Sequence, residues 1–409
     1  MTNPAMRFRG DDGITFPDWD SSEIGNVADI CSGGTPSTSV SEYWDGSIQW
    51  LTPTEINSKY VHNSKRTITS VGLENSSAKL LPIGALLLTT RATIGACSIN
   101  NFDGAVSTNQ GFQSLICKSA LFNEYAYYAI TRDKFQKELI KHSSGSTFLE
   151  ISSKNLKKLP IPIPCLEEQQ KIASFFSTLD QKIELNERKL EALEKLKKGL
   201  MQKIFSQRIR FRSDNDQSFP AWKTVKLSEI SQPLTYGLNS PAKPFDGENK
   251  YLRITDIDER TNKYIQDAPV SPSAKPDNKY SLEEGDIVFA RTGNSVGKTY
   301  IYQKEDGKLY YAGFLIRARI NTGTCPYFIF IQTLTETYKN WVRVTSQRSG
   351  QPGINAEEYG NYVLAMPSLE EQTKIASLFI HFDKKIELVL AKINSLKKVK
   401  QGFMQQMFV

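Results

Sequence analysis

The sequence predicts a mixed α/β fold. Two α/β domains are separated by an antiparallel coiled coil of two long helices, in a pseudo-two-fold internal repeat. Three observations lead to this prediction. The stretch LEEQQKIASFFSTLDQKIEL at 166–185 returns as LEEQTKIASLFIHFDKKIEL at 369–388, an offset of 203 residues. Both copies carry apolar residues at the heptad spacing of a coiled coil. Each copy follows a large segment that combines strand-like apolar runs with helical stretches.

The repeat involves a whole unit of the chain rather than one helix. At the offset of 203, residues 166–205 and 369–408 agree at 22 of 40 positions, and FPDW at 16–19 aligns with FPAW at 219–222. A single offset at separated places indicates duplication of a module of one domain and one helix. The expected parts are a first domain at 1–165, a first helix at 166–207, a second domain at 208–368 and a second helix at 369–409.

Both large segments have the pattern of mixed α/β structure. GALLLTTRATIGACSI (84–99) and GDIVFARTGNSVGKTYIY (285–302) each place a turn with arginine and glycine between runs rich in β-branched and aromatic residues. This pattern predicts strand–turn–strand. NEYAYYAITRDKFQKELIKH (123–142) and YFIFIQTLTETYKNWVRV (327–344) read as helical. The repeats keep the frame and vary its content, as expected of two domains that do the same job on different targets.

Each long helix carries an apolar seam with alternating steps of four and three residues over about five heptads. Ordinary surface helices have a wider apolar stripe and run three to four turns, so pairing of one copy with the other is favoured over packing on its own domain. Asn186, Lys197 and Lys400 are polar seam positions, which would fix the register or mark where another helix or protein docks. The predicted seam comprises Ile172, Phe176, Leu179, Ile183, Asn186, Leu190, Leu193, Leu200, Ile375, Phe379, Phe382, Ile386, Val389, Ile393, Leu396 and Phe403.

Charge and cysteine content limit the class of protein. The 409 residues carry a net charge of +7, and the basic excess lies in the helical segments 166–212 and 369–409, while the rest is neutral overall. Nucleic-acid binding therefore cannot be concluded from bulk charge. Five scattered cysteines indicate a reducing compartment. No apolar run is long enough to span a bilayer or to form a secretory signal. We therefore expect a cytoplasmic protein.

The sequence contains no convincing catalytic motif. RTGNSVGKT (291–299) imitates a phosphate-binding loop, but three residues separate its glycines where four are needed, and a strand-like run follows. The three histidines have no metal-ligand spacing, and the Asn/Asp-Pro-Pro-aromatic tetrapeptide of adenine methyltransferases is missing. The expectation is a protein with no catalytic residues and no metal of its own.

At this point the chain resembles the specificity (S) subunit of bacterial type I restriction–modification systems, over essentially its whole length. The resemblance rests on IPIPCLEEQQKIASFFSTLDQKIEL (161–185) and MPSLEEQTKIASLFIHFDKKIEL (366–388). GGTPSTSVSEYWDGSIQW (33–50) also resembles the opening of a first target-recognition domain in this family. The corresponding stretch of the second domain, PLTYGLNSPAKPF (233–245), lacks the Gly-Gly-Thr-Pro and Tyr-Trp elements of that opening. The roles that the resemblance implies for those elements are therefore not assigned to the second domain.

The resemblance implies a division of labour. Each variable domain would read one half of a bipartite target in double-stranded DNA, and the helices would set the spacer and dock two modification (methyltransferase) subunits. Restriction (translocase and nuclease) subunits would join them. The chain would bind no cofactor, with S-adenosylmethionine, ATP and Mg in the partner subunits. A coiled-coil scaffold with protein-binding ends is the alternative, and it predicts no salt-sensitive DNA affinity in the assembled complex.

Polar loop residues are the candidate DNA contacts, because hydroxyl, amide and cationic groups suit base edges and phosphates. Trp44 can equally be a core aromatic. The candidates in the first domain are Thr35, Ser37, Trp44, Lys59, Arg91, Thr93, Asn109, Gln110 and Ser146. Those in the second are Tyr236, Asn239, Lys243, Arg253, Arg291, Asn294, Ser295, Lys298, Gln347, Arg348 and Gln351.

Overall fold

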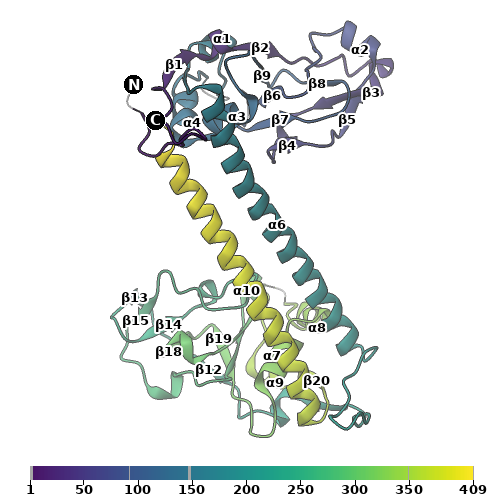
Figure 1. The fold of residues 1–409 in the computed structure, drawn as a ribbon. Coiled ribbons are helices and arrows are strands. Elements are labelled where there is room, and N and C mark those ends of the chain that lie inside the picture. The colour runs from purple at the N-terminus through teal and green to yellow at the C-terminus, as the bar shows by residue number, and fades with distance from the viewer. Residues whose placement is uncertain (1–2, 92, 146–148, 349, 409) are drawn as a thin grey trace. The chain divides into compact units, whose positions relative to one another are not determined.

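The computed structural model describes residues 3–91, 93–145, 149–348 and 350–408 (Figure 1). The chain divides into two compact units. Unit 1 comprises Met1–Glu187 and Ala391–Val409, and unit 2 comprises Arg188–Leu390. Each unit therefore holds one α/β domain together with a part of each long helix. No helix in the described part of the chain is long and apolar enough to cross a membrane.

The domain of unit 1 contains a five-stranded sheet, a three-stranded sheet and a two-stranded pair. The five-stranded sheet has the order β2 (Ala28–Ser32), β9 (Gln113–Cys117), β6 (Leu86–Leu88), β7 (Cys97–Asn100) and β4 (Tyr60–Val61). The three-stranded sheet has the order β5 (Arg66–Ile68), β3 (Trp44–Leu51) and β8 (Val106–Thr108). The pair is β1 (Asp20–Glu23) with β10 (Pro160–Ile163), and the helices are α1 (Ile24–Val27), α2 (Ser70–Glu74), α3 (Asn123–Thr131), α4 (Asp133–Lys141) and α5 (Ser153–Lys157).

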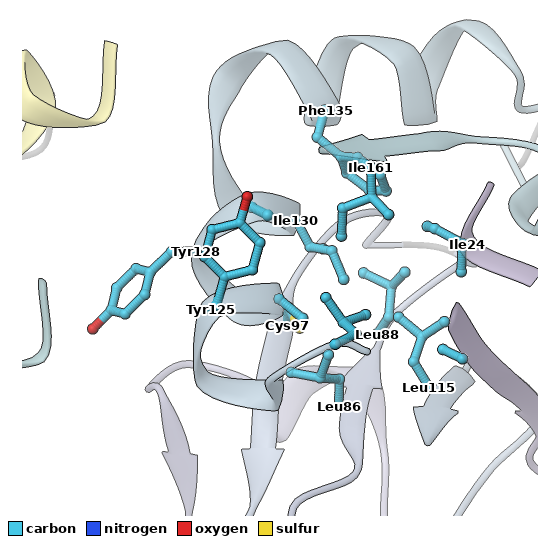
Figure 2. Packing of buried hydrophobic residues seen from close by; sticks show 14 of the residues in the cluster. Ile24, Leu86, Leu88, Cys97, Leu115, Tyr125, Tyr128, Ile130, Phe135 and Ile161 are labelled. Carbon is cyan, nitrogen blue, oxygen red and sulfur yellow. The ribbon is translucent and has the colours of Figure 1, made fainter. Parts of the chain in front are cut away.

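The main core of unit 1 lies between helix α3 and the five-stranded sheet. Figure 2 shows Ile130 of α3 directed towards Leu88 of β6, with Leu86 and with Leu115 of β9 nearby. The Tyr125 ring of α3 points away from these leucines, and its hydroxyl donates to Pro162 O at 3.0 Å. Strands β6 and β7 are buried along their whole length. In β6 this explains the continuous apolar run Leu86–Leu88, whereas in β7 the buried Ser98 and Asn100 donate to backbone carbonyls. This packing confirms the mixed α/β prediction for the first domain.

The domain of unit 2 repeats this scheme with different content. Its largest sheet has the order β12 (Thr235–Tyr236), β19 (Leu315–Ala318), β16 (Ile287–Ala290) and β17 (Thr299–Ile301). The two-stranded pairs are β11 (Lys223–Lys226) with β20 (Val363–Met366), β13 (Ala242–Pro244) with β15 (Val270–Pro272), and β14 (Lys250–Leu252) with β18 (Leu309–Tyr311). The α-helices of this domain are α7 (Pro326–Gln332), α8 (Glu336–Thr345) and α9 (Ala356–Gly360).

The long helices are α6 (Leu166–Phe205) and α10 (Leu369–Gln406), and they run antiparallel within each unit (Figure 1). In unit 1, Phe175 near the start of α6 packs on Phe403 near the end of α10, with ring centroids 5.0 Å apart. In unit 2, Met201 and Ile204 at the end of α6 share a core with the start of α10. The antiparallel coiled coil is thus confirmed from the contacts of each unit taken by itself.

The apolar seam positions lie at this interface. The predicted seam residues that are half-buried are Asn186, Leu193, Leu200, Leu396 and Phe403, and the others are buried. The polar positions have partners. Lys400 Nζ lies 2.6 Å from Asp180 Oδ1 in unit 1, and Lys197 pairs with Asp383 in unit 2.

Each of these aspartates also ties a domain to its own long helix. The Tyr128 hydroxyl donates to Asp180 Oδ2 at 2.7 Å, and the Tyr327 hydroxyl donates to Asp383. Burial raises the pKa of Tyr128, and the neighbouring carboxylate raises it further, so the phenol remains a donor. The polar seam positions therefore connect three elements in each unit.

The two repeated motifs, LEEQ at the start of each long helix and FPxW at the start of each domain, are joined by hydrogen bonds. Glu168 is fully buried and accepts hydrogen bonds from Arg7 (Nε 3.0 Å, Nη2 2.7 Å) and from Trp19 Nε1 (2.9 Å). Glu371 accepts the same set from Arg210 (3.1 and 2.6 Å) and Trp222 (3.1 Å). Every member of the second set is 203 residues after its counterpart. We call these contacts the anchor.

Candidate nucleic-acid interface

Two loops of unit 1 bring four predicted residues together. Thr35 follows Gly33 and Gly34, which have no room for a side chain: a Cβ on Gly33 would lie 2.0 Å from Asn109 O. The Gly34 amide donates to Thr108 O at 2.8 Å. As a result the Thr35 hydroxyl donates to the side chain of Gln110. Exposed Thr35, Ser37 and Gln110 and half-buried Asn109 thus form a polar edge of this domain.

Arg91 and Thr93 lie on a turn that is bonded to the same region. The Thr90 amide donates to Gly111 O at 2.8 Å, next to Asn109 and Gln110 in the chain. The Arg91 side chain is half-exposed, and its Nε lies 3.7 Å from Glu150 Oε2. Ser146, another predicted contact, lies outside the described residues.

Two candidates of the first domain lie in its interior. Trp44 is buried: it packs edge-on against Trp50 at 5.1 Å, it lies under the Arg66 guanidinium at 3.5 Å, and its Nε1 donates to Ser37 O at 3.0 Å. It is a core aromatic that supports the 33–39 loop from behind. Residue type alone does not show whether a tryptophan packs in the core or stacks on a DNA base.

Lys59 is also occupied by contacts inside unit 1. Its side chain is only 10% exposed and pairs with Glu124, while Nζ lies 3.1 Å from the Tyr128 hydroxyl and 3.3 Å from Ser177 Oγ. Lys59 therefore links β4, α3 and α6 instead of facing solvent. Desolvating a lysine to this extent is tolerated because a carboxylate and hydroxyls surround it.

Unit 2 contains a cleft of about 720 Å³ that gathers four of the predicted residues. We call it the arginine cleft. It is lined by Tyr236 of β12, Asn239, Arg253, Thr255, Arg291 and Phe314, among others. Phe314 was not predicted. It is 60% exposed on the turn before β19, and its one available signal was a glycine–phenylalanine pair between two strand-like runs.

The two arginines of the arginine cleft differ in their partners. Arg253 donates to Asp256 twice, from Nε (2.9 Å) and Nη2 (2.7 Å), and these hydrogen bonds raise its pKa. The Arg291 guanidinium carbon lies 5.0 Å from the ring centre of Tyr236 and 6.0 Å from that of Phe314. Among the side chains that the structure describes, Arg291 Nε is buried without a hydrogen-bond partner.

The remaining candidates of unit 2 do not line the arginine cleft. Gln351 approaches Gly293, where a Cβ would lie 3.1 Å from its Nε2, and Asn294 and Gln347 are exposed. Arg348 pairs with Glu358. Lys243 is exposed on β13, beside the cleft residue Ala242. Ser295 is half-buried, and Lys298 lines a separate cleft of about 1160 Å³ next to α6 and α8, 4.0 Å from Glu259.

A comparison with known families decides the identity. The family described as "Type I restriction modification DNA specificity domain" matches residues 17–195 and 221–398, one match for each module of the repeat. The chain belongs to this family. Its members recognise DNA targets, which favours DNA recognition over a scaffold without DNA readout. No group of three His, Cys, Asp or Glu within the described ranges could hold a metal ion.

Relatives and solved structures agree with this family. The type I restriction enzyme MjaIX specificity subunit of Methanocaldococcus jannaschii is 32% identical over 293 residues, which cover 68% of this chain and 67% of the relative. The S subunit of a type I restriction-modification system from M. genitalium has the same fold, with a TM-score of 0.66 and 18% identity over 100% of this chain and 99% of that one. A chain from a structure on complex assembly of the type I R-M system has a TM-score of 0.56 and 17% identity, over 96% and 98%.

Proposed function

We propose that this specificity protein reads a bipartite DNA target, one half with each domain. Residues 1–165 and 208–368 would be the two readers, and the long helices would set the spacer between the half-sites. The proposal rests on the contrast between the anchor, which is repeated in both units, and the candidate DNA-contacting surfaces, which differ between them. The anchor is the same in both units, contact for contact, whereas the polar edge of unit 1 and the arginine cleft of unit 2 share no residue pattern.

The readers would contribute recognition and no chemistry. Modification subunits would carry S-adenosylmethionine, and restriction subunits would carry ATP and Mg. A methyltransferase has to extrude its target adenine from the duplex, so a specificity protein would hold the register and ease the deformation of the site. The neutral charge of both domains supports this division, because much of the phosphate binding would then come from the partners.

The helices offer a surface for two copies of one partner. In unit 1, Leu185 of α6 and Val399 of α10 are exposed, and the Lys397–Glu187 ion pair (2.7 Å) gives the register in which they lie opposite one another. In unit 2, Leu388 of α10 and Leu196 of α6 are exposed as well. Both pairs are related by the offset of 203. We propose that each pair docks one modification subunit, because exposed apolar residues repeated in this way suit identical partners.

The proposal is tested by mapping methylation in cells that carry the modification subunits with or without this chain. We expect one bipartite motif, methylated in both halves, which disappears without the chain. Replacing residues 1–165 with those of a relative should change one half of the motif only. Methylation that does not depend on the chain, or a change in both halves at once, would contradict the proposal. A steep fall of DNA affinity with salt would separate DNA reading from a scaffold role.

A further inference from the structure

Arg291 is available for recognition in a way that its neighbour is not. Arg253, in the same cleft, donates two hydrogen bonds from its guanidinium group to the Asp256 carboxylate. Arg291 has no such partner in the described part of unit 2, and its buried Nε makes no hydrogen bond. A buried donor without an acceptor is destabilising, and an acceptor supplied by a ligand would remove that cost.

The Arg291 side chain is held in place before any ligand arrives. Its backbone amide donates to Phe314 O at 3.1 Å, and its carbonyl accepts from Ile354 N at 2.9 Å. The rings of Tyr236 and Phe314 lie within cation–π distance of the guanidinium. Tyr236 is itself fixed, since its hydroxyl accepts from Ala356 N at 3.1 Å. A planar fork held between aromatic rings loses little side-chain freedom when it binds.

Arg291 is not part of the frame that the two domains share. The turns that contain Arg91 and Arg291 look equivalent in sequence, but their hydrogen bonds show a shift. Arg291 donates to Phe314 O and accepts from Ile354 N, whereas the residue that donates to Gly111 O and accepts from Ile151 N (3.2 Å) is Thr90. Thr90 is fully buried, and the neighbouring Arg91 faces Glu150. The second domain therefore has an arginine where the first has a buried threonine.

We propose that Arg291 selects a guanine in the half-site read by the second domain. This inference rests on the proposed function. Arginine binds guanine through O6 and N7 with two parallel hydrogen bonds, the commonest specific contact in the major groove. Phosphate is the competing ligand for a guanidinium. A phosphate contact that only positions the DNA would serve both domains alike, and we would expect it at the same place in each. An arginine present in one reader alone fits a role in sequence discrimination.

The test uses the complete modification complex with its methylation motif already mapped. We expect a guanine in the half-site that stays unchanged when residues 1–165 are exchanged. Arg291→Ala should slow methylation of the cognate duplex about 10- to 100-fold and accept other bases at that guanine, with the other half-site unchanged. Arg343→Ala is the matched control. It removes the same charge from an exposed position on α8, outside the arginine cleft, and should leave the motif intact.

A modified duplex shows whether the contact is direct. 7-Deazaguanine at that position removes the N7 acceptor, so it should slow the wild-type complex and leave the Arg291→Ala complex unaffected. If Arg291→Ala prevents assembly, Arg291→Lys keeps the charge without the planar fork and should still relax the motif. Equal slowing on every sequence, with a salt slope lower by about one, would assign Arg291 to phosphate and overturn the inference. A half-site without guanine would overturn it too. In both cases the bipartite motif survives, so the proposed function would stand.

Discussion

Removing the charge of Glu168 should weaken unit 1 selectively. Glu168→Gln keeps the size of the side chain but removes its charge and replaces one carboxylate oxygen by an NH2 group, which cannot accept from Arg7 or Trp19. The Arg7 side chain is 10% exposed and Glu168 is not exposed at all, so the pair is close to fully desolvated. Breaking a buried pair typically costs about 3–5 kcal/mol. Arg7 also donates to Pro17 O at 2.6 Å, a contact that survives, so we expect a loss of about 3 kcal/mol.

Glu371→Gln is the matched variant in unit 2. It removes the charge and one acceptor oxygen in the same way, but the Arg210 side chain is 26% exposed and water can replace part of the lost contact. We expect a smaller loss, about 2 kcal/mol.

Hydrogen exchange followed by mass spectrometry gives the assay, because it measures each unit separately in a chain that does not unfold as a single two-state domain. Peptides of unit 1 should exchange faster in Glu168→Gln, and peptides of unit 2 in Glu371→Gln. Equal acceleration in both units, or a loss below about 0.5 kcal/mol in either variant, would refute the view that each domain depends on its own anchor.

Three further predictions concern the helices and one turn. Lys400→Met leaves Asp180 without its cation, so we expect chemical denaturation to show a loss of about 1–2 kcal/mol that Asp180→Asn partly restores in the double variant. Inserting four residues near the middle of α6 adds about one turn, ~6 Å, and methylation mapping should show a spacer longer by about one to two base pairs with both halves unchanged. Asp258 accepts hydrogen bonds from the Thr261 hydroxyl and amide (both 2.7 Å), and these bonds lower its pKa. The turn should therefore keep its full stability above the ordinary aspartate pKa and lose it as pH falls through the lower folded value, and an NMR titration of Asp258 would check this sign.

The frame of the molecule could be predicted from the sequence because repetition and heptad spacing are local signals. The match between the FPDW and FPAW stretches was visible, but its cause was not, since Trp19 and Glu168 are far apart in the chain and only the folded structure joins them. The same holds for Lys197 and Lys400. Their seam positions were evident, whereas the carboxylates that receive them could not be identified.

The candidate interface was predictable only in part. Exposed loop residues such as Thr35 and Gln110 follow from composition, and the structure does bring them together. Trp44 and Lys59 lie inside the first domain, and residue type does not reveal such burial. The sequence also did not show that Arg291 corresponds to Thr90 rather than to Arg91. The two turns differ in length, and only their hydrogen bonds establish which residues correspond.

The way each domain is closed has a consequence for how such proteins can diversify. Strand β1 enters the first domain beside β10, which leaves it, and β11 and β20 enclose the second domain in the same way. The polypeptide between the two strands of each pair therefore begins and ends at the same place in the domain. That place is next to the buried carboxylate of Glu168 in unit 1 and of Glu371 in unit 2. The loops of this polypeptide can lengthen, shorten or be replaced without displacing the helix that follows. If each domain reads half of a target as proposed, variation between the paired strands would change which bases are selected and leave the anchor in place.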